Sequence, residues 1–247
     1  MATFGRSDEL KEARFVDVNL RGARFLESDL SEVVMRGIDA RNMDIDAPWI
    51  SDKDSYLRVN GVDVSAFVEA ELDRRFPGRS QRRAQDPEGL RSAWAAVEAT
   101  WASTLERAAA MPAGSVDVSV DGEWSFAQTL RHLVHGTDMW MGRAILELDR
   151  PFHPIGQAYT ADEAGSAPSA IPPYAEVLEV RADRLALVRD FIASVTPEEL
   201  DAARKNPHSP ARPETVRSCL HVLLDEAWEH HRFAVRDLDA IEARSDA

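Results

Sequence analysis

The sequence predicts a mainly α-helical protein, a four-helix bundle preceded by a short segment of a different kind. Four long stretches carry apolar residues at spacings of three and four, as amphipathic helices do. One long proline-rich link separates the second stretch from the third, as in bundles with a crossover connection. Residues 11–46 follow neither helical nor strand spacing and repeat with a period of five instead.

Composition narrows the classes of function. The chain has 247 residues, 44% of them hydrophobic and 29% charged, which is typical of a soluble globular protein. Its formal charge of −14 repels phosphate backbones, so we expect no direct binding of nucleic acid. The single cysteine, Cys219, excludes an intrachain disulfide and falls in an apolar pattern, which favours a place in the core over a role as nucleophile. No leader and no apolar run of about 18 residues is evident, so we expect a cytoplasmic protein without membrane contact.

The repeat of five occupies the start of the chain. Every fifth residue is apolar, and a second column of small or apolar residues lies two places before it. The first column contains Phe15, Leu20, Phe25, Leu30, Met35, Ala40 and Ile45. A chain that turns a corner every five residues, as in a β-solenoid, would produce this period. The alternative is chance spacing in a loop-rich leader.

The repeat resembles the pentapeptide-repeat family over residues 11–46, most closely at Val18-Asn19-Leu20 and Ser28-Asp29-Leu30. The resemblance implies a short right-handed β-helix of fewer than two coils, which should lean on the rest of the protein. Together with a hairpin about Asn60-Gly61 and a helix over 65–72 capped by Ser65, it forms a first predicted domain, residues 11–76.

The second predicted domain, residues 87–243, contains the bundle. Apolar periodicity, caps and prolines predict helices at 88–111, 125–148, 174–194 and 213–243, a hairpin at 115–124 and a short turn after Thr196. The link over 150–173 is long for a compact domain, and links of this length are often lids or crossovers.

A candidate metal site combines the second and fourth predicted helices. Glu226 and His230 are four residues apart, so they share one face of a helix, together with the apolar Leu223 and Phe233. With His132 from the other helix, they supply two imidazoles and one carboxylate. Three protein ligands with a vacant fourth position are typical of a catalytic divalent metal site.

Other interpretations of these residues remain open. Glu226 and His230 could form a simple hydrogen bond, a histidine could be buried neutral, and His231 could replace His230 as a ligand. We expect His135 to lie on a polar stripe with Arg131 and Asp138, and His153, His208 and His221 to lie at the surface. A second stripe is expected to form a solvated face of the last helix: Asp225, Glu229, Arg232, Arg236 and Asp239.

The stretches Trp124–Val134 and Asp225–Leu238 resemble the DinB superfamily, and the resemblance extends over residues 88–243. It implies a four-helix bundle that binds a divalent metal, zinc or nickel, through His132, Glu226 and His230. The His/Glu/His set is similar to that of the mycothiol-dependent maleylpyruvate isomerase branch. The resemblance further implies a low-molecular-weight thiol such as mycothiol as cofactor and a small electrophile as substrate.

Two functions are therefore considered. The first is a metal-dependent enzyme of the thiol transferase or isomerase type. The second is a non-catalytic, stress-associated binding or scaffold protein that interacts through the repeat segment. A homodimer is compatible with either.

Overall fold

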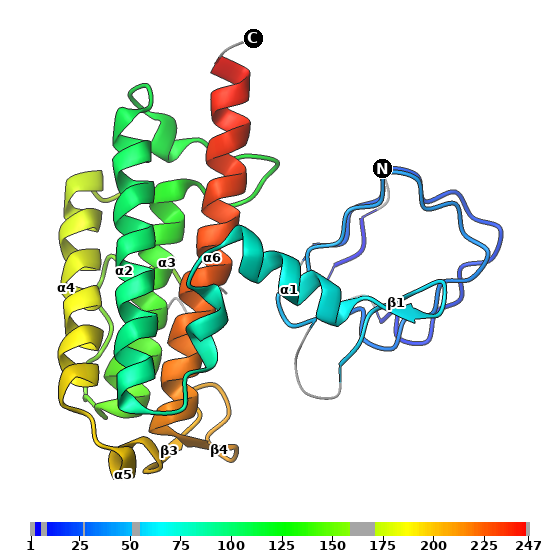
Figure 1. Ribbon diagram of the computed structural model, residues 1–247. Helices are drawn as coiled ribbons and strands as arrows, with labels where there is room; N and C mark the ends of the chain where they lie inside the picture. Colours follow the sequence, from blue (N-terminus) through cyan, green and yellow to red (C-terminus); the bar gives the residue numbers. More distant parts are fainter. Residues whose placement is uncertain (1–2, 6–8, 27, 51–54, 159–170, 246–247) are drawn as a thin grey trace. The chain divides into compact units, whose positions relative to one another are not determined.

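The chain divides into two compact units, Met1–Asp46 and Ala47–Ala247, in the computed structural model. The structure describes residues 3–5, 9–26, 28–50, 55–158 and 171–245. Within these ranges all helices and strands belong to the second unit, and the described residues of the first unit form turns, bends and backbone without regular secondary structure (Figure 1).

The backbone of the first unit repeats every five residues. Left-handed φ angles occur at Glu12, Asp17, Gly22, Glu32, Gly37 and Asn42, and position 27, which would continue the series, lies outside the described residues. Turn hydrogen bonds such as Ala13 N to Leu10 O (3.0 Å) and Ala23 N to Leu20 O (2.9 Å) recur every ten residues. The described residues 9–26 and 28–46 contain no strand, so a β-helix is not shown.

The apolar columns of this unit are exposed to solvent. Phe15 is 56% exposed, Phe25 60% and Met35 51%, and every other described residue of the unit is exposed as well. The described residues of the unit therefore form no buried core of their own, which agrees with the expectation for so short a segment.

The second unit begins with a small hairpin and a helix. Strands β1 (Arg58–Val59) and β2 (Val62–Asp63) pair about Asn60-Gly61, as expected, and both turn residues have positive φ. Helix α1 runs over Ser65–Arg75. The expected cap at Ser65 is wrong: its Oγ accepts a hydrogen bond from Leu57 N (2.9 Å) and so joins the helix to the hairpin.

Four long helical segments form the bundle, and Figure 1 shows them side by side. They are α2 (Pro87–Ala110), α3 (Phe126–Thr137) continued by the π-helix η3 (Asp138–Ile145), α4 (Tyr174–Ser194) and α6 (Val216–Ser245). Indole N–H groups of α2 cross-link the bundle: Trp94 donates to Leu185 O (3.2 Å) and Trp101 to Ala227 O (3.1 Å). Among the described residues, none of the helices combines the length and apolar character required to cross a membrane.

Two local predictions are wrong. Residues 115–124 form the 3-10 turn η2 (Ser115–Asp117) and a loop, because their backbone groups bond to near neighbours and not across a hairpin. Pro213 belongs to strand β4 (Pro213–Thr215), which pairs with β3 (Ala203–Lys205) after the short helix α5 (Pro197–Leu200). Helix α6 starts at Val216, where Thr215 Oγ1 accepts from Ser218 N (3.1 Å).

The link after η3 runs back along the bundle. Residues 151–158, which we call the strap, belong to the predicted link over 150–173. Two of them, Ile155 and Ala158, are buried. Pro151, the first residue of the strap, packs against Gly142 of η3. A Cβ on Gly142 would lie 2.9 Å from Pro151 Cβ, so this close approach requires a glycine. Residues 159–170 of the link lie outside the described residues.

We expect Ser125→Ala to lower the free energy of unfolding by about 1 kcal/mol, because it removes the cap of α3. Ser125 Oγ accepts from Gln128 N (3.3 Å), and Gln128 Oε1 accepts from Ser125 N (2.9 Å). Urea denaturation measures the change. Ser103→Ala, on an exposed position inside α2, is the matched control and should cost less than half as much; equal costs would contradict the capping role.

Candidate metal centre

His132 reaches the candidate site from the second helix of the bundle. The capping box at Ser125 fixes the start of α3, and His132 lies two turns later on its buried side with 7% of its surface exposed. Gln157 O in the strap lies 3.0 Å from His132 Nδ1. A carbonyl oxygen only accepts hydrogen bonds, so Nδ1 carries the proton and Nε2 faces the interior.

Glu226 and His230 reach the same place from α6. His230 Nε2 lies 3.1 Å from Glu226 Oε2, and His132 Nε2 lies 3.5 Å from the same oxygen. One ligand atom from each of the three side chains falls within 4.8 Å of the others. The structure therefore brings together the three residues that the sequence predicted, from two helices almost a hundred residues apart.

The charge of Glu226 is stabilised by its neighbours. Burial disfavours the ionised carboxylate, but the contacts with His132 and His230 outweigh burial and hold the pKa of Glu226 well below its usual range. The Glu226 side chain retains 23% exposure, against 9% for His132 and 13% for His230. The carboxylate of the cluster is thus ionised, and Glu226 is the member of the cluster that is most accessible to solvent.

Aromatic side chains form a wall of the site. The Trp124 ring lies 4.7 Å from the His132 ring and is stacked on the His230 ring at 6.2 Å. Phe233 meets His230 edge-on at 5.8 Å, and the guanidinium of Arg232 lies 4.5 Å above the Phe233 ring. Nothing in the sequence spacing connects Trp124, which lies before α3, with α6, so its place in the site could not be predicted.

The other histidines lie elsewhere. His231 is buried, and its Nε2 is 2.9 Å from Thr104 Oγ1, so it contacts α2 and not the cluster. His135 is half-buried and stacks on Phe152 at 5.0 Å, and His221 Nε2 bonds to Ala84 O (2.7 Å), so their expected exposure is wrong. Among the remaining two, His208 is exposed as expected and His153 is half-buried in the strap.

Cys219 is fully buried, as expected. Burial, with the nearby Glu214, raises the pKa of its thiol to about 12. The thiol is therefore protonated near neutral pH and is a core residue, so a nucleophilic thiolate would have to come from another molecule.

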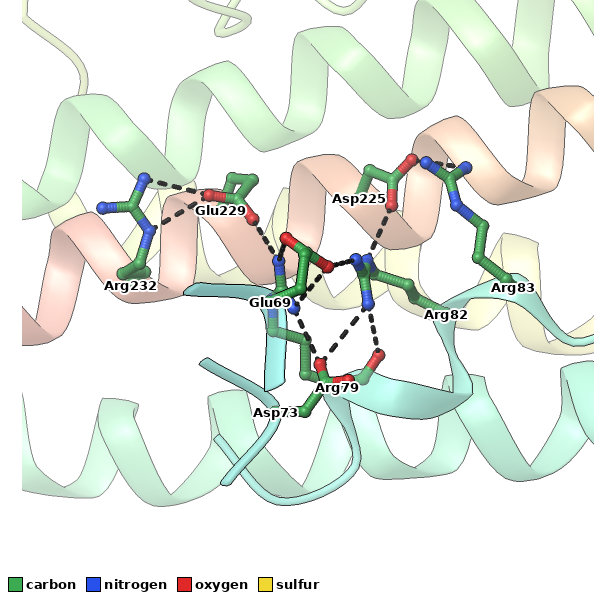
Figure 2. A network of polar contacts seen from close by, with 8 residues as sticks. All are labelled: Glu69, Asp73, Arg79, Arg82, Arg83, Asp225, Glu229 and Arg232. Atoms are coloured by element: carbon green, nitrogen blue, oxygen red, sulfur yellow. Dashed lines mark hydrogen bonds and ion pairs between the residues drawn. The ribbon is translucent and has the colours of Figure 1, made fainter. Parts of the chain in front are cut away.

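The expected solvated face of α6 is wrong over its first half. Asp225 and Glu229 are 6% and 8% exposed, because the 3-10 helix η1 (Arg79–Arg83) covers them with arginines (Figure 2). Arg79 Nη2 lies 3.3 Å from Glu229 Oε1, and Arg83 Nη1 lies 2.8 Å from Asp225 Oδ2. The sequence signal for this network was the cluster of arginines in the short polar stretch between the two predicted domains.

The buried guanidinium of Arg79 joins two helices. It is 3% exposed and contacts Glu69 (3.0 Å) and Asp73 (2.7 Å) of α1 in addition to Glu229 of α6. Burial disfavours its charge, but these carboxylates raise the pKa of Arg79 above its usual value. A pocket beside this network is lined by Pro48, Trp49 and network residues, and it does not include the His/Glu/His cluster. The network fixes the face of α6 that carries Asp225 and Glu229. This face adjoins the one that carries Glu226 and His230.

The fold and the cluster define a four-helix-bundle protein with an internal His/Glu/His site. The family model of the DinB superfamily matches residues 96–234, more than half of the chain. The chain therefore belongs to the DinB superfamily. No match was found among curated proteins or among solved structures.

We expect Arg79→Leu to lower the free energy of unfolding by about 1.5–3 kcal/mol, because it removes the buried cation that Glu69, Asp73 and Glu229 share. Arg82 and Arg232 still contact these carboxylates in the variant, which limits the loss. Arg83→Leu is the matched control: its side chain is 51% exposed, and the loss should be under about 1 kcal/mol. Guanidinium chloride denaturation compares the two. Similar costs would show that Arg79 is no more important than a surface ion pair.

Proposed function

We propose that the protein binds one divalent metal ion, zinc or nickel, through His132 Nε2, the Glu226 carboxylate and His230 Nε2. The observation that carries the proposal is the convergence of two imidazoles and one carboxylate, whose ligand atoms lie within 4.8 Å of one another. With Nδ1 bonded to Gln157 O, His132 directs Nε2 toward Glu226 Oε2 at 3.5 Å, and His230 Nε2 lies 3.1 Å from the same oxygen. A set of nitrogen and oxygen donors of this kind suits a divalent cation.

The composition of the cluster also fits a metal. Imidazole suits zinc and nickel, and a set of two imidazoles and one carboxylate leaves a coordination position open. A divalent ion there would lower the pKa of a bound water or thiol and hold the anion near neutral pH. The exposed side of Glu226 leaves room for approach, and Trp124 would exclude water from one side.

We expect near one metal per chain in wild-type protein offered zinc or nickel, measured by elemental analysis after removal of unbound metal. His230→Ala should lose the metal. Glu226→Gln keeps the size of the side chain and weakens binding at least about tenfold, because it removes the anionic ligand. His208→Ala, an exposed histidine outside the cluster, is the control and should bind as wild type. Wild-type protein without metal under these conditions would sink the proposal.

The chemistry proposed for this site is addition or transfer of a low-molecular-weight thiol, such as mycothiol, to a small electrophile. Support comes from membership of the DinB superfamily and from the similarity of the His/Glu/His set to the isomerase branch. Cys219 is buried and protonated, so the sulfur nucleophile would be the cofactor's. The thiol would lie against Trp124.

We expect metal-loaded protein to accelerate thiol consumption by an electrophile at least about tenfold over free metal, because the pKa of a bound thiol falls. Loss of free thiol, followed by colorimetric assay with mycothiol and with glutathione, measures the rate. His230→Ala should abolish the acceleration. A metal-loaded protein that accelerates no thiol reaction would favour the non-catalytic alternative.

The alternative function is a stress-associated scaffold that binds a partner, or a second copy of itself, through residues 11–46. The exposed aromatic side chains Phe15 and Phe25 of the first unit favour it. This alternative retains the proposed pentapeptide-repeat relationship and the division into domains 11–76 and 87–243.

A further inference from the structure

The strap is anchored to the bundle by buried polar contacts. Asp138 at the start of η3 is 2% exposed, and its Oδ2 accepts from His153 N (2.7 Å). The other oxygen accepts from Arg184 Nε of α4 (2.5 Å), so the carboxylate itself is held in place. Ile155, two residues further along the strap, is 3% exposed. Between these two anchors the strap makes a turn, in which Gly156 N donates to His153 O (3.0 Å).

The next contacts lead to the candidate metal ligand. Arg131 is buried, and its Nε donates to Ile155 O (2.8 Å). Gln157 uses both of its backbone groups: its N–H donates to Arg131 O (3.0 Å), and its C=O accepts from His132 Nδ1 (3.0 Å). The strap is thus fixed by hydrogen bonds directly before the carbonyl that contacts His132.

The contact determines which nitrogen His132 presents. Because Gln157 O is an acceptor, it holds the proton on Nδ1 and leaves Nε2 to the cluster. A carbonyl does this without adding negative charge beside Glu226. Hydrogen bonds of this kind to a ligand imidazole commonly set metal affinity and ring orientation.

We propose that the strap is the positioning element of the metal centre: its docking on α3 holds the Gln157 carbonyl against His132 and so sets the affinity for metal. The inference rests on the metal binding proposed above. It assigns a function to the backbone of Gln157 and none to its side chain. The part of the link that the structure describes is then not only a connection between α3 and α4.

Gly156 offers a way to shift the strap without touching a ligand. A Cβ there would lie 3.2 Å from His153 O and 3.3 Å from His135 Cβ, so the strap or its neighbour on α3 must give by a few tenths of an ångström for Ala. Val, which is larger, is expected to displace the strap further. Gly136, next to His135 on α3, is the matched control, because a Cβ there meets nothing within 4 Å. Ala at position 136 also favours the helix.

The test is competitive titration of metal-free full-length protein with zinc against a chromophoric chelator. Gly156→Val should weaken zinc binding about 10–100-fold while one zinc per chain still binds at saturation, and Gly156→Ala should weaken it less. Gly136→Ala should bind as wild type. Zinc affinity of Gly156→Val within about twofold of wild type overturns the inference.

A second measurement separates this inference from the proposed function. In metal-free protein, nitrogen-15 NMR should show a slowly exchanging Nδ1–H of His132 in wild type and Gly136→Ala. The signal should exchange faster in Gly156→Val, which circular dichroism must show to be folded; Gly156→Ala replaces it if it is not. Should wild type bind no zinc, the proposed function fails, while the NMR result still decides whether the strap positions His132. An Nδ1–H unaffected by Gly156→Val and Gly156→Ala would overturn the positioning role.

Discussion

Helix α6 is buried on more than one side although it carries carboxylates on those sides, and the arrangement around it follows from the need to neutralise them. A buried carboxylate without a partner costs several kcal/mol. Asp225 and Glu229 obtain guanidinium partners from η1, and Glu226 obtains two imidazoles. The two faces of the helix thus stabilise their carboxylates with different partners, arginines on one face and histidines on the other.

The two kinds of partner differ in what they allow chemically. The arginines around Asp225 and Glu229 are permanent cations, so that network is complete without a ligand and serves to fix α6. Imidazoles are neutral or charged according to their surroundings and are good metal ligands when neutral. The face with Glu226 and His230 is therefore the one whose side chains could hold a metal ion. A rigid helix with one complete face is suited to hold the other in position.

The strap likewise provides partners for buried charged residues, here on α3 and η3. Arg131 and Asp138 were expected at the surface, yet both are buried, because strap backbone groups and Arg184 bond to them. His132 lies between these two anchors along the helix. A ligand whose ring is held on both edges loses little conformational freedom when a metal binds, which favours affinity.

Residues 1–46 form a unit of a different kind. The backbone repeats every five residues, but the described apolar side chains of the repeat remain exposed to solvent. An exposed apolar surface of this kind is where an interaction would be sought. The function proposed for the bundle does not depend on it, since all three candidate ligands belong to the second unit.

The sequence by itself predicted the four helices, the cap at Ser125 and the candidate ligands, with His231 left open as an alternative to His230. These predictions depend on local spacing and on the cost of burying polar residues. The i, i+4 relation of Glu226 and His230 is a property of one helix and needs no tertiary information. Only the tertiary structure decided between His230 and His231, buried the stripe of Asp225 and Glu229, and placed Gln157 beside His132. Those outcomes depend on which segment packs over each helix face. A stripe of charges has the same local pattern whether water or a row of arginines covers it, and a backbone carbonyl has no sequence pattern at all.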